Sequence, residues 1–311
     1  WQEGTLLETR KYLNIDSSLS SEPKEKISEE TLVEIYRLIT RMRHLDERMV
    51  NLQRQGDISF AMSSLGEEVS IIASAAALES CDWIYPQYRE QAALFWRGYN
   101  IQDYVHHMFC NGKDSILGRQ MPNHFGSREL NVVTVSSPVG TQITHAAGCG
   151  YAMKLQKSPE VALCYFGEGT ASEGDFHVAL NFAAVKKSQT IFFCRNNGFA
   201  ISTRSSSQFA SYGIAERGIA YNMQSIRVDG NDPFAVYDAV RQARLACIAG
   251  EGPVLIEAMT YRTGPHSTSD DPSVYREKEE TLSWEKELCP KVRLRNYLDS
   301  KDLWNDELEE Q

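Results

Sequence analysis

Cys164-Tyr-Phe-Gly-Glu-Gly-Thr-Ala-Ser-Glu-Gly-Asp175, followed by Cys194-Arg-Asn-Asn-Gly-Phe199, is the stretch that decides the fold. The apolar run 161–166 that leads into it is short enough to be a buried parallel strand. Residues 173–185 carry apolar side chains at helical spacing, and residues 190–194 form a second apolar run. This order predicts a strand–helix–strand unit whose two strands end in polar loops at one edge of a sheet.

The residues at the two strand ends predict a magnesium site. Glu168 offers a carboxylate oxygen, and Asn197, 29 residues later, offers an amide oxygen. A nearby main-chain carbonyl, that of Phe199, adds a third oxygen. Mg²⁺ takes few protein ligands of this kind and completes its shell with phosphate and water, so these oxygens suit it.

A diphosphate site is predicted at the same place. Gly167 and Gly169 would let the main chain approach a phosphate closely, and the following helix would present free N–H groups. Arg195 adds a permanent cation whose planar fork matches phosphate oxygens. The alternative is that a glycine turn and an asparagine turn only end two strands. The carboxylate and the arginine at paired strand ends favour the magnesium–diphosphate site.

These residues also carry a family resemblance. Gly167-Glu168-Gly169 followed by Asn196-Asn197 resembles the thiamin diphosphate fingerprint, in which the middle residue is usually Asp. The neighbourhood resembles the α subunit of the decarboxylating (E1) component of 2-oxo acid dehydrogenase complexes, and most of all its branched-chain members. The resemblance runs from about Ser28 to the end of the chain, through these motifs: Pro86-Gln-Tyr-Arg-Glu90, Gly118-Arg-Gln-Met-Pro122, Ser136-Ser-Pro138, Thr141-Gln142, Ser225-Ile-Arg-Val-Asp-Gly-Asn-Asp232, Ile256-Glu-Ala-Met-Thr-Tyr-Arg262 and His266-Ser-Thr-Ser-Asp-Asp271.

The resemblance implies a thiamin diphosphate-binding α/β fold, with a doubly wound, mostly parallel sheet flanked by helices. It implies oxidative decarboxylation of branched-chain 2-oxo acids and acyl transfer to the lipoyl group of an E2 transacylase. The family builds its cofactor site between subunits, and the glutamate that meets the aminopyrimidine comes from a β subunit. We therefore expect a heterotetramer of two α and two β subunits, with Mg²⁺ and K⁺ beside thiamin diphosphate.

Two further loops acquire specific roles through this resemblance. From the residues alone, we expect the segment 85–90 to be a solvated turn. The oxygen-rich segment 136–142 suits either a weakly charged cation such as K⁺ or a helix start capped by Ser137 and Thr141, and capping is favoured. The resemblance instead places Gln87, Tyr88, Arg89, Ser137 and Val139 on the cofactor. It assigns K⁺ to Ser136, Pro138 (through its carbonyl), Thr141 and Gln142.

The segment 260–271 leaves a strand at the same edge and is rich in turn-forming residues, so we expect a mobile loop. Its His266 is either an ordinary loop histidine or, by resemblance, the residue that sits by the cofactor and assists acyl transfer. Ser267 matches a serine that regulatory kinases modify and a phosphatase restores, and a phosphate there would add about two negative charges beside His266. His145 and the remaining histidines are expected to lie in solvent or in a satisfied core.

Composition limits the other possibilities. The 311 residues are 42% hydrophobic and 24% charged, as in soluble globular proteins, and the net charge of −10 disfavours nonspecific nucleic-acid binding. No apolar run reaches the length of a membrane span. Seven cysteines without a C-x-x-C pair favour free thiols in a reducing compartment. By resemblance that compartment is the mitochondrial matrix, or the cytoplasm of a bacterium.

The chain divides into an extended polar arm, 1–27, and one domain, 28–311. Ser28 is expected to cap a long amphipathic helix that runs to about Gln55. We expect strands at 132–135, 225–228 and 254–258, a helix at 233–249, and charged helices in 277–311. The family usually continues with a further helical tail, beyond the point where this sequence ends.

Two other functions stay open at this point. The same role for pyruvate is one, and a non-catalytic regulatory subunit with this fold is the other. A nicotinamide-binding enzyme is disfavoured because the chain lacks Gly-x-Gly-x-x-Gly followed by an acidic residue at the next strand end.

Overall fold

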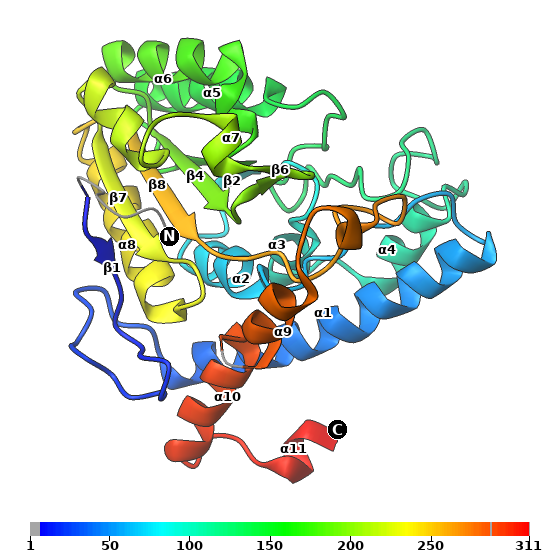
Figure 1. Cartoon of the computed structure of the whole chain (residues 1–311). Coiled ribbons are helices and arrows are strands. Elements are labelled where there is room, and N and C mark those ends of the chain that lie inside the picture. The colour runs from blue at the N-terminus through cyan, green and yellow to red at the C-terminus, as the bar shows by residue number, and fades with distance from the viewer. Residues whose placement is uncertain (1–6, 287, 311) are drawn as a thin grey trace.

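A computed structural model describes residues 7–286 and 288–310, so the first six residues of the predicted arm lie outside it. Its centre is a six-stranded sheet with the order β1-β7-β8-β4-β3-β2 (Figure 1). Every neighbouring pair in this sheet is parallel, which confirms the predicted fold class. The strands are β1 (Thr9–Arg10), β2 (Trp83–Tyr85), β3 (Ala162–Gly167), β4 (Thr190–Asn196), β7 (Gln224–Asp229) and β8 (Val254–Met259).

Helices surround the sheet, and a small hairpin lies outside it. The α-helices are α1 (Glu29–Gln55), α2 (Glu68–Ala76), α3 (Gln91–Trp96), α4 (Ile101–Met108), α5 (Thr141–Gln156), α6 (Gly174–Lys186), α7 (Ser205–Gln208), α8 (Pro233–Ile248), α9 (Lys278–Lys286), α10 (Pro290–Ser300) and α11 (Asp306–Glu310). The 3-10 helices are η1 (Thr170–Ser172), η2 (Ala215–Tyr221) and η3 (Pro272–Val274), and the hairpin pairs β5 (Phe199–Ala200) with β6 (Thr203–Arg204).

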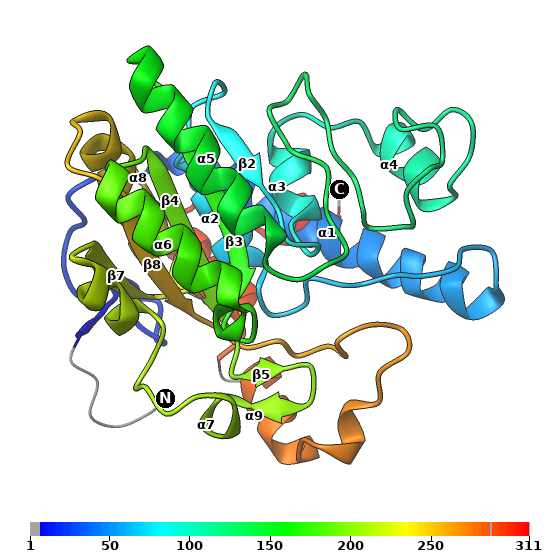
Figure 2. The ribbon, with the colours of Figure 1, turned by 90° about the horizontal axis from the view of Figure 1, so that it is seen from above.

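The direction of each crossover decides which face its helix covers. The chain steps from β2 to β3 to β4 in one direction across the sheet, and α5 and α6 lie together on one face (Figure 2). The step from β7 to β8 runs in the opposite direction. Because parallel crossovers are right-handed, reversing the direction moves α8 to the other face, where α2 joins it.

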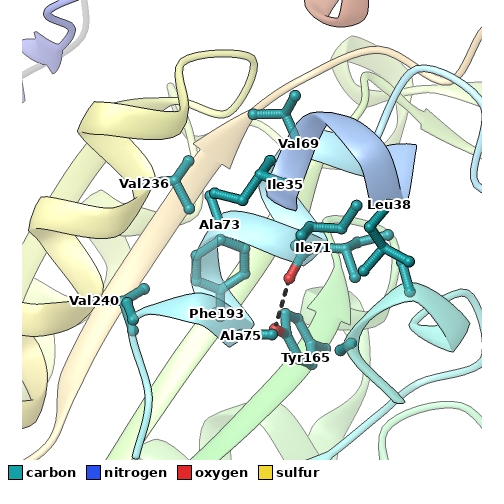
Figure 3. Packing of buried hydrophobic residues seen from close by; sticks show 14 of the residues in the cluster. Ile35, Leu38, Val69, Ile71, Ala73, Ala75, Tyr165, Phe193, Val236 and Val240 are labelled. Carbon is teal, nitrogen blue, oxygen red and sulfur yellow. Dashed lines mark hydrogen bonds between the residues drawn. The ribbon is translucent and has the colours of Figure 1, made fainter. Parts of the chain in front are cut away.

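Two hydrophobic cores result. The larger one packs α1, α2 and α8 against the sheet, as Figure 3 shows with Ile35 of α1, Ala73 of α2 and Val236 of α8 near Phe193 of β4. The smaller one packs α5 and α6 against the opposite face. In the larger core the Tyr165 hydroxyl is 2.7 Å from the Ser74 hydroxyl, so its polar end is satisfied inside apolar surroundings.

The predicted long helix is confirmed as α1. Ser28 caps it, its hydroxyl accepting the N–H of Thr31 at 3.1 Å, and Gly56 ends it in a left-handed conformation at φ 86°. The helices expected within 277–311 are confirmed as α9, α10 and α11. Within the described residues, no helix combines the length and the hydropathy that crossing a bilayer requires.

The described part of the arm lies on the edge of the sheet. Strand β1 pairs with β7, and Leu13 beyond it is fully buried. The carboxylate of Asp232 accepts the main-chain N–H groups of Tyr12 at 2.6 Å and Leu13 at 2.8 Å. The arm therefore adds a strand to the domain, which its polar composition did not predict.

The strand predicted at 132–135 is wrong. Val132 makes only isolated bridges, to Ile84 and Ser127. The Val133 N–H donates to the Ile84 carbonyl at 2.9 Å, but Val135 turns away to donate to Phe125 at 3.0 Å. This apolar run thus forms one isolated bridge with the edge strand and then leaves the sheet. Sequence periodicity alone cannot distinguish such a run from a true strand.

Candidate functional site

Glu168 and Asn197 lie side by side at the carboxyl edge of the sheet. Gly167, the last residue of β3, pairs with Arg195 in β4, so the residues that follow leave the sheet together. The Asn197 N–H donates to Oε2 of Glu168 at 3.3 Å. The strand–helix–strand unit thus places the two predicted magnesium ligands together, as their spacing suggests.

The carboxylate of Glu168 has the character of a cation ligand. Its side chain is buried, and its Oε1 atom has no hydrogen-bond partner. Burial raises the pKa of Glu168 to about 7. A bound cation would both occupy the unpartnered oxygen and stabilise the charged form, so the residues present fit a divalent ion. In the described part of the chain no three His, Cys, Asp or Glu side chains cluster as metal ligands, so such an ion would rely on this one carboxylate and on neutral oxygens.

A cavity of about 440 Å³ opens at these strand ends. All the residues that the sequence predicts on the cofactor line it: Gln87, Tyr88, Arg89, Ser137, Val139, Gly167, Glu168, Gly169, Arg195, Asn197 and His266. Phe199 lines it as well. One part of the wall is apolar, formed by Phe60, Met62 and Met121. The predicted K⁺ residues Ser136, Pro138, Thr141 and Gln142 are not in the cavity wall.

Arg195 is held between two buried carboxylates. Its Nη1 donates to Glu67 at 2.7 Å, and its Nη2 donates to Glu90. Burial by itself lowers the pKa of Arg195, but Glu90 and Glu67 more than offset it and keep the pKa above the usual value. Arg195 is therefore a fixed, fully charged group beside the cavity, and its contact with a diphosphate stays a prediction.

Arg89 anchors the loop that carries His266. Its Nη1 donates to the Ser63 carbonyl at 2.8 Å, and its Nη2 donates to the His266 carbonyl at 2.6 Å. The same Nη2 is 3.0 Å from Nδ1 of His266, and Nη1 of Arg262 is 3.4 Å from that atom. The backbone N–H of His266 donates to Asp270 at 2.7 Å. The loop is thereby held against the cavity by Arg89 from the 85–90 segment, and Arg262 at its own start adds a second cation.

These contacts determine the protonation of His266. Burial, and then the positive charges of Arg89 and Arg262, lower the pKa of His266 to about 3. The imidazole is therefore neutral near pH 7. Arginine can only donate hydrogen bonds, so Nδ1 is the acceptor and the ring proton is on Nε2.

Gln87 and Gly169 shape the wall near the glycine turn. The Gln87 side-chain oxygen accepts the Gly167 N–H at 2.7 Å, which joins the 85–90 segment to the end of β3. A Cβ atom at Gly169 would lie 2.6 Å from the Cβ of Ala200, so only glycine allows the turn to approach the hairpin this closely. The short η1 helix separates this turn from α6, so the N-terminus of α6 does not follow the glycines directly.

The loop 136–142 does not cap its helix with side chains. The N-cap of α5 is Gly140, at φ 96°, and no side chain bonds to it, so the alternative of capping by Ser137 and Thr141 is wrong. The Thr141 hydroxyl instead donates to the Pro138 carbonyl at 3.3 Å. The Gln142 amide nitrogen donates to Tyr165 at 3.1 Å, which leaves its oxygen for other partners. The K⁺ assignment to this loop remains a prediction.

Several cavity residues had no predicted role. Nε2 of His124 lies 2.7 Å from the Ser137 hydroxyl, inside the cavity wall. Arg262 lines the cavity as well. Glu67, a buried acid at the start of α2, contacts Arg195 and Asn197 from behind the wall. His145 is exposed, as expected.

Comparison with known proteins assigns the family. Residues 36–311 match the family model described as "Dehydrogenase E1 component". The chain is 49% identical over 282 residues to the mitochondrial 2-oxoisovalerate dehydrogenase subunit alpha of Caenorhabditis elegans, covering 90% of this chain and 65% of that protein. The protein of the same name from Dictyostelium discoideum is 50% identical over 285 residues, with coverages of 91% and 65%. The human protein of that name is 48% identical over 287 residues, with coverages of 92% and 63%.

The chain thus spans slightly less than two thirds of the length of these relatives. The match extends over both strand ends and over the loop that carries His266. This chain belongs to the dehydrogenase E1 component family.

Proposed function

We propose that this chain is the α subunit of a thiamin diphosphate-dependent enzyme that decarboxylates branched-chain 2-oxo acids, those derived from leucine, isoleucine and valine. The acyl group would pass to the lipoyl group of an E2 transacylase. One observation carries the proposal: Glu168, buried with an unpartnered oxygen, stands beside Asn197 at the edge of a parallel sheet, in a cavity lined by the other expected cofactor residues. Family membership supports the thiamin diphosphate dependence.

The site residues divide into two groups by chemistry. Glu168, Asn197 and the Phe199 carbonyl would hold Mg²⁺, and Arg89 and Arg195 would balance the charge of the diphosphate. The thiazolium of bound thiamin diphosphate supplies the electron sink for the decarboxylation. This chain would bind and orient the cofactor and would exclude water from one side of the cavity.

His266 would supply a proton donor. Because its ring proton is on Nε2 and its Nδ1 faces Arg89 and Arg262, the Nε2–H group is the one free to donate. The two guanidinium groups keep the ring from gaining a second proton near pH 7. A neutral donor beside an anionic diphosphate can orient an oxygen or transfer a proton without carrying a charge of its own.

The apolar wall supports a branched aliphatic substrate. Phe60, Met62 and Met121 line the cavity with Tyr88, and methionine side chains adapt to irregular aliphatic groups. Pyruvate has only a methyl group to place there. The relatives are named for 2-oxoisovalerate, a branched 2-oxo acid, which supports the same substrate class.

A β subunit would complete the enzyme. The face formed by α5 and α6 leaves large apolar side chains exposed, among them Leu155 at 66%, Val178 at 63% and Val185 at 71%. This face lies on the outside of the sheet in both views (Figures 1 and 2). Exposed apolar patches of this kind mark protein interfaces, so we assign the β subunit to it. Family membership supports a heterotetramer of two α and two β subunits.

Three finer assignments belong to the same proposal. K⁺ would bind the oxygens of the 136–142 loop. Ser267 would be the target of a regulatory kinase and phosphatase, since it directly follows His266. The relatives are named as mitochondrial, which supports the mitochondrial matrix as the location.

A substrate panel tests the proposal. The chain, assembled with its β subunit, is supplied with thiamin diphosphate, Mg²⁺ and a lipoylated acceptor. We expect 4-methyl-2-oxopentanoate and 3-methyl-2-oxobutanoate to be preferred over pyruvate in kcat/KM. A preference for pyruvate would refute the substrate assignment, and cofactor binding without turnover of any 2-oxo acid would favour a non-catalytic subunit.

A further inference from the structure

Glu67, at the start of α2, contacts three of the residues expected on the cofactor. It is fully buried and is the N-cap residue of that helix. Its Oε1 accepts from Nη1 of Arg195 at 2.7 Å and from Nδ2 of Asn197 at 3.3 Å. Its Oε2 lies 3.8 Å from Nε of Arg89 and has no hydrogen-bond partner. One carboxylate thus connects the expected magnesium ligand with the two expected diphosphate cations.

The contact with Glu67 determines which way the Asn197 amide points. An ionised carboxylate can only accept, so the NH₂ group must face Glu67. On the other side the Phe199 N–H can only donate, and it reaches Oδ1 of Asn197 at 3.1 Å. Both partners require the same orientation. Oδ1 is therefore held on the side away from Glu67, where the second lone pair of this oxygen is left for a cation.

Glu67 is held beside two permanent cations. Its carboxylate pairs with Nη1 of Arg195 at 2.7 Å and lies 3.8 Å from Nε of Arg89. Arg195 in turn is held from its other end by Glu90. These ion pairs keep Glu67 an acceptor toward Asn197.

We infer that Glu67 is a positioning residue that fixes the side-chain oxygen of Asn197, and with it the Mg²⁺ affinity of the site. The inference rests on the proposed function, because that function supplies the Mg²⁺ and the diphosphate. Partners of metal ligands change metal affinity by roughly 10- to 100-fold when they are removed, which sets the expected effect.

The adjacent residue offers a matched control. Glu68 is the same residue type, is equally buried, and lies at the same helix end. Its carboxylate contacts Nε of Arg43 at 2.7 Å and the Gly66 N–H at 2.9 Å. None of the residues expected on the cofactor is among these partners. A loss of general stability at this helix end would appear in both variants, whereas a loss of Mg²⁺ affinity should appear only at Glu67.

The experiment measures the Mg²⁺ concentration that half-saturates thiamin diphosphate binding, by calorimetry, in the chain assembled with its β subunit. We expect Glu67→Gln to raise this concentration about tenfold or more, because an amide can present either a donor or an acceptor to Asn197. We expect Glu68→Gln to match the wild type. If Glu67→Gln does not assemble, Glu67→Asp, whose side chain is one methylene shorter, replaces it in the comparison. An Mg²⁺ requirement in Glu67→Asp equal to that of the wild type would contradict the inference.

A double-mutant cycle separates positioning from structural support. Asn197→Asp places two carboxylates next to each other, so Glu67→Gln in that background removes a repulsion and supplies a donor to Asp at 197. The inference therefore predicts a reversal: Glu67→Gln weakens Mg²⁺ binding beside Asn197 and strengthens it beside the aspartate. An equal effect of Glu67→Gln in both backgrounds would overturn it.

The remaining outcomes are distinguishable. If the wild-type assembly binds thiamin diphosphate with Mg²⁺ and Glu67→Gln behaves like Glu68→Gln, the inference fails and the proposed function stands. If the wild-type assembly does not bind the cofactor, the proposed function fails and the inference falls with it.

Discussion

Arg89 contacts His266 twice through one nitrogen: Nη2 is 2.6 Å from the carbonyl oxygen and 3.0 Å from Nδ1 of the ring. The first contact holds the loop and the second determines the tautomer. Arg262 approaches the same Nδ1 atom at 3.4 Å. The result is a neutral imidazole, with a defined proton, at the edge of a cavity where an anion is expected.

Removing one of these cations should change the pH dependence of acyl transfer. The charge of Arg262 lowers the pKa of His266, so Arg262→Gln should raise it. His266 would then become an inactive imidazolium at a higher pH than in the wild type. The acid limb of the pH profile of kcat for lipoyl acylation should therefore shift to higher pH. In the wild type His266 should contribute no transition between pH 5 and 8, since its pKa is about 3. An unchanged acid limb in the variant would contradict this reading.

Glu168 should make the metal-free protein less stable as the pH rises. Its pKa in the folded state is about 7, above the ordinary value of 4.5. The stabilisation of its neutral form is therefore complete below about pH 4.5 and is lost as the pH rises through 7. A difference of this size corresponds to roughly 3 kcal/mol.

Glu168→Gln removes that effect and is the direct test. The free energy of unfolding is measured in urea without metal or cofactor. As the pH rises from 5 to 8, this free energy should fall in the wild type but not in the variant. In the assembly with the β subunit, Mg²⁺ with thiamin diphosphate should raise the stability of the wild type and not of the variant. A variant that loses the same stability as the wild type over this pH range would show that Glu168 is not the titrating group.

A negative charge at Ser267 should disturb the loop. Ser267 lies beside His266, whose N–H donates to Asp270, and the Tyr275 hydroxyl also donates to Asp270 at 2.6 Å. A phosphate, or Ser267→Glu, would repel Asp270 and the diphosphate. We expect at least a tenfold loss of kcat/KM and faster proteolysis of the 263–275 segment. Ser269→Asp, on an exposed side chain of the same loop, is the control and should keep near wild-type activity.

The exposed face of α5 and α6 should be required for assembly. Val185→Asp would place a charge in the patch where we assign the β subunit, and an unpaired charge in an interface costs several kcal/mol. Co-purification with the β subunit should fall at least tenfold, with no loss of fold by circular dichroism. Val274→Asp is the control: Val274 is more exposed, at 81%, but lies in η3, so this variant should assemble normally.

Much of this molecule could be predicted from local sequence. The strand–helix–strand unit was recognisable because its apolar runs and its polar ends coincide, and the spacing of Glu168 and Asn197 was enough to place them together. The long helix α1 was recognisable from its period and its cap.

What could not be predicted depends on contacts between distant segments. Arg195 has the appearance of a free phosphate ligand in the sequence, and only the fold shows that Glu67, 128 residues earlier, and Glu90 hold it. The run 132–135 has strand composition but leaves the sheet after one isolated bridge, between Val132 and Ile84. The polar arm became a strand because β7 offered an unpaired edge, which is a property of the sheet and not of the arm.

Glu168 and Asn197 are proposed to form a magnesium–diphosphate site that a β subunit completes. The most direct test is calorimetric titration of thiamin diphosphate with Mg²⁺ into the chain alone, into the chain co-expressed with a β subunit, and into that assembly carrying Glu168→Ala. We predict binding only in the wild-type assembly, with Glu168→Ala abolishing it. Equally tight binding to the lone chain, or binding that survives Glu168→Ala, would contradict the claim.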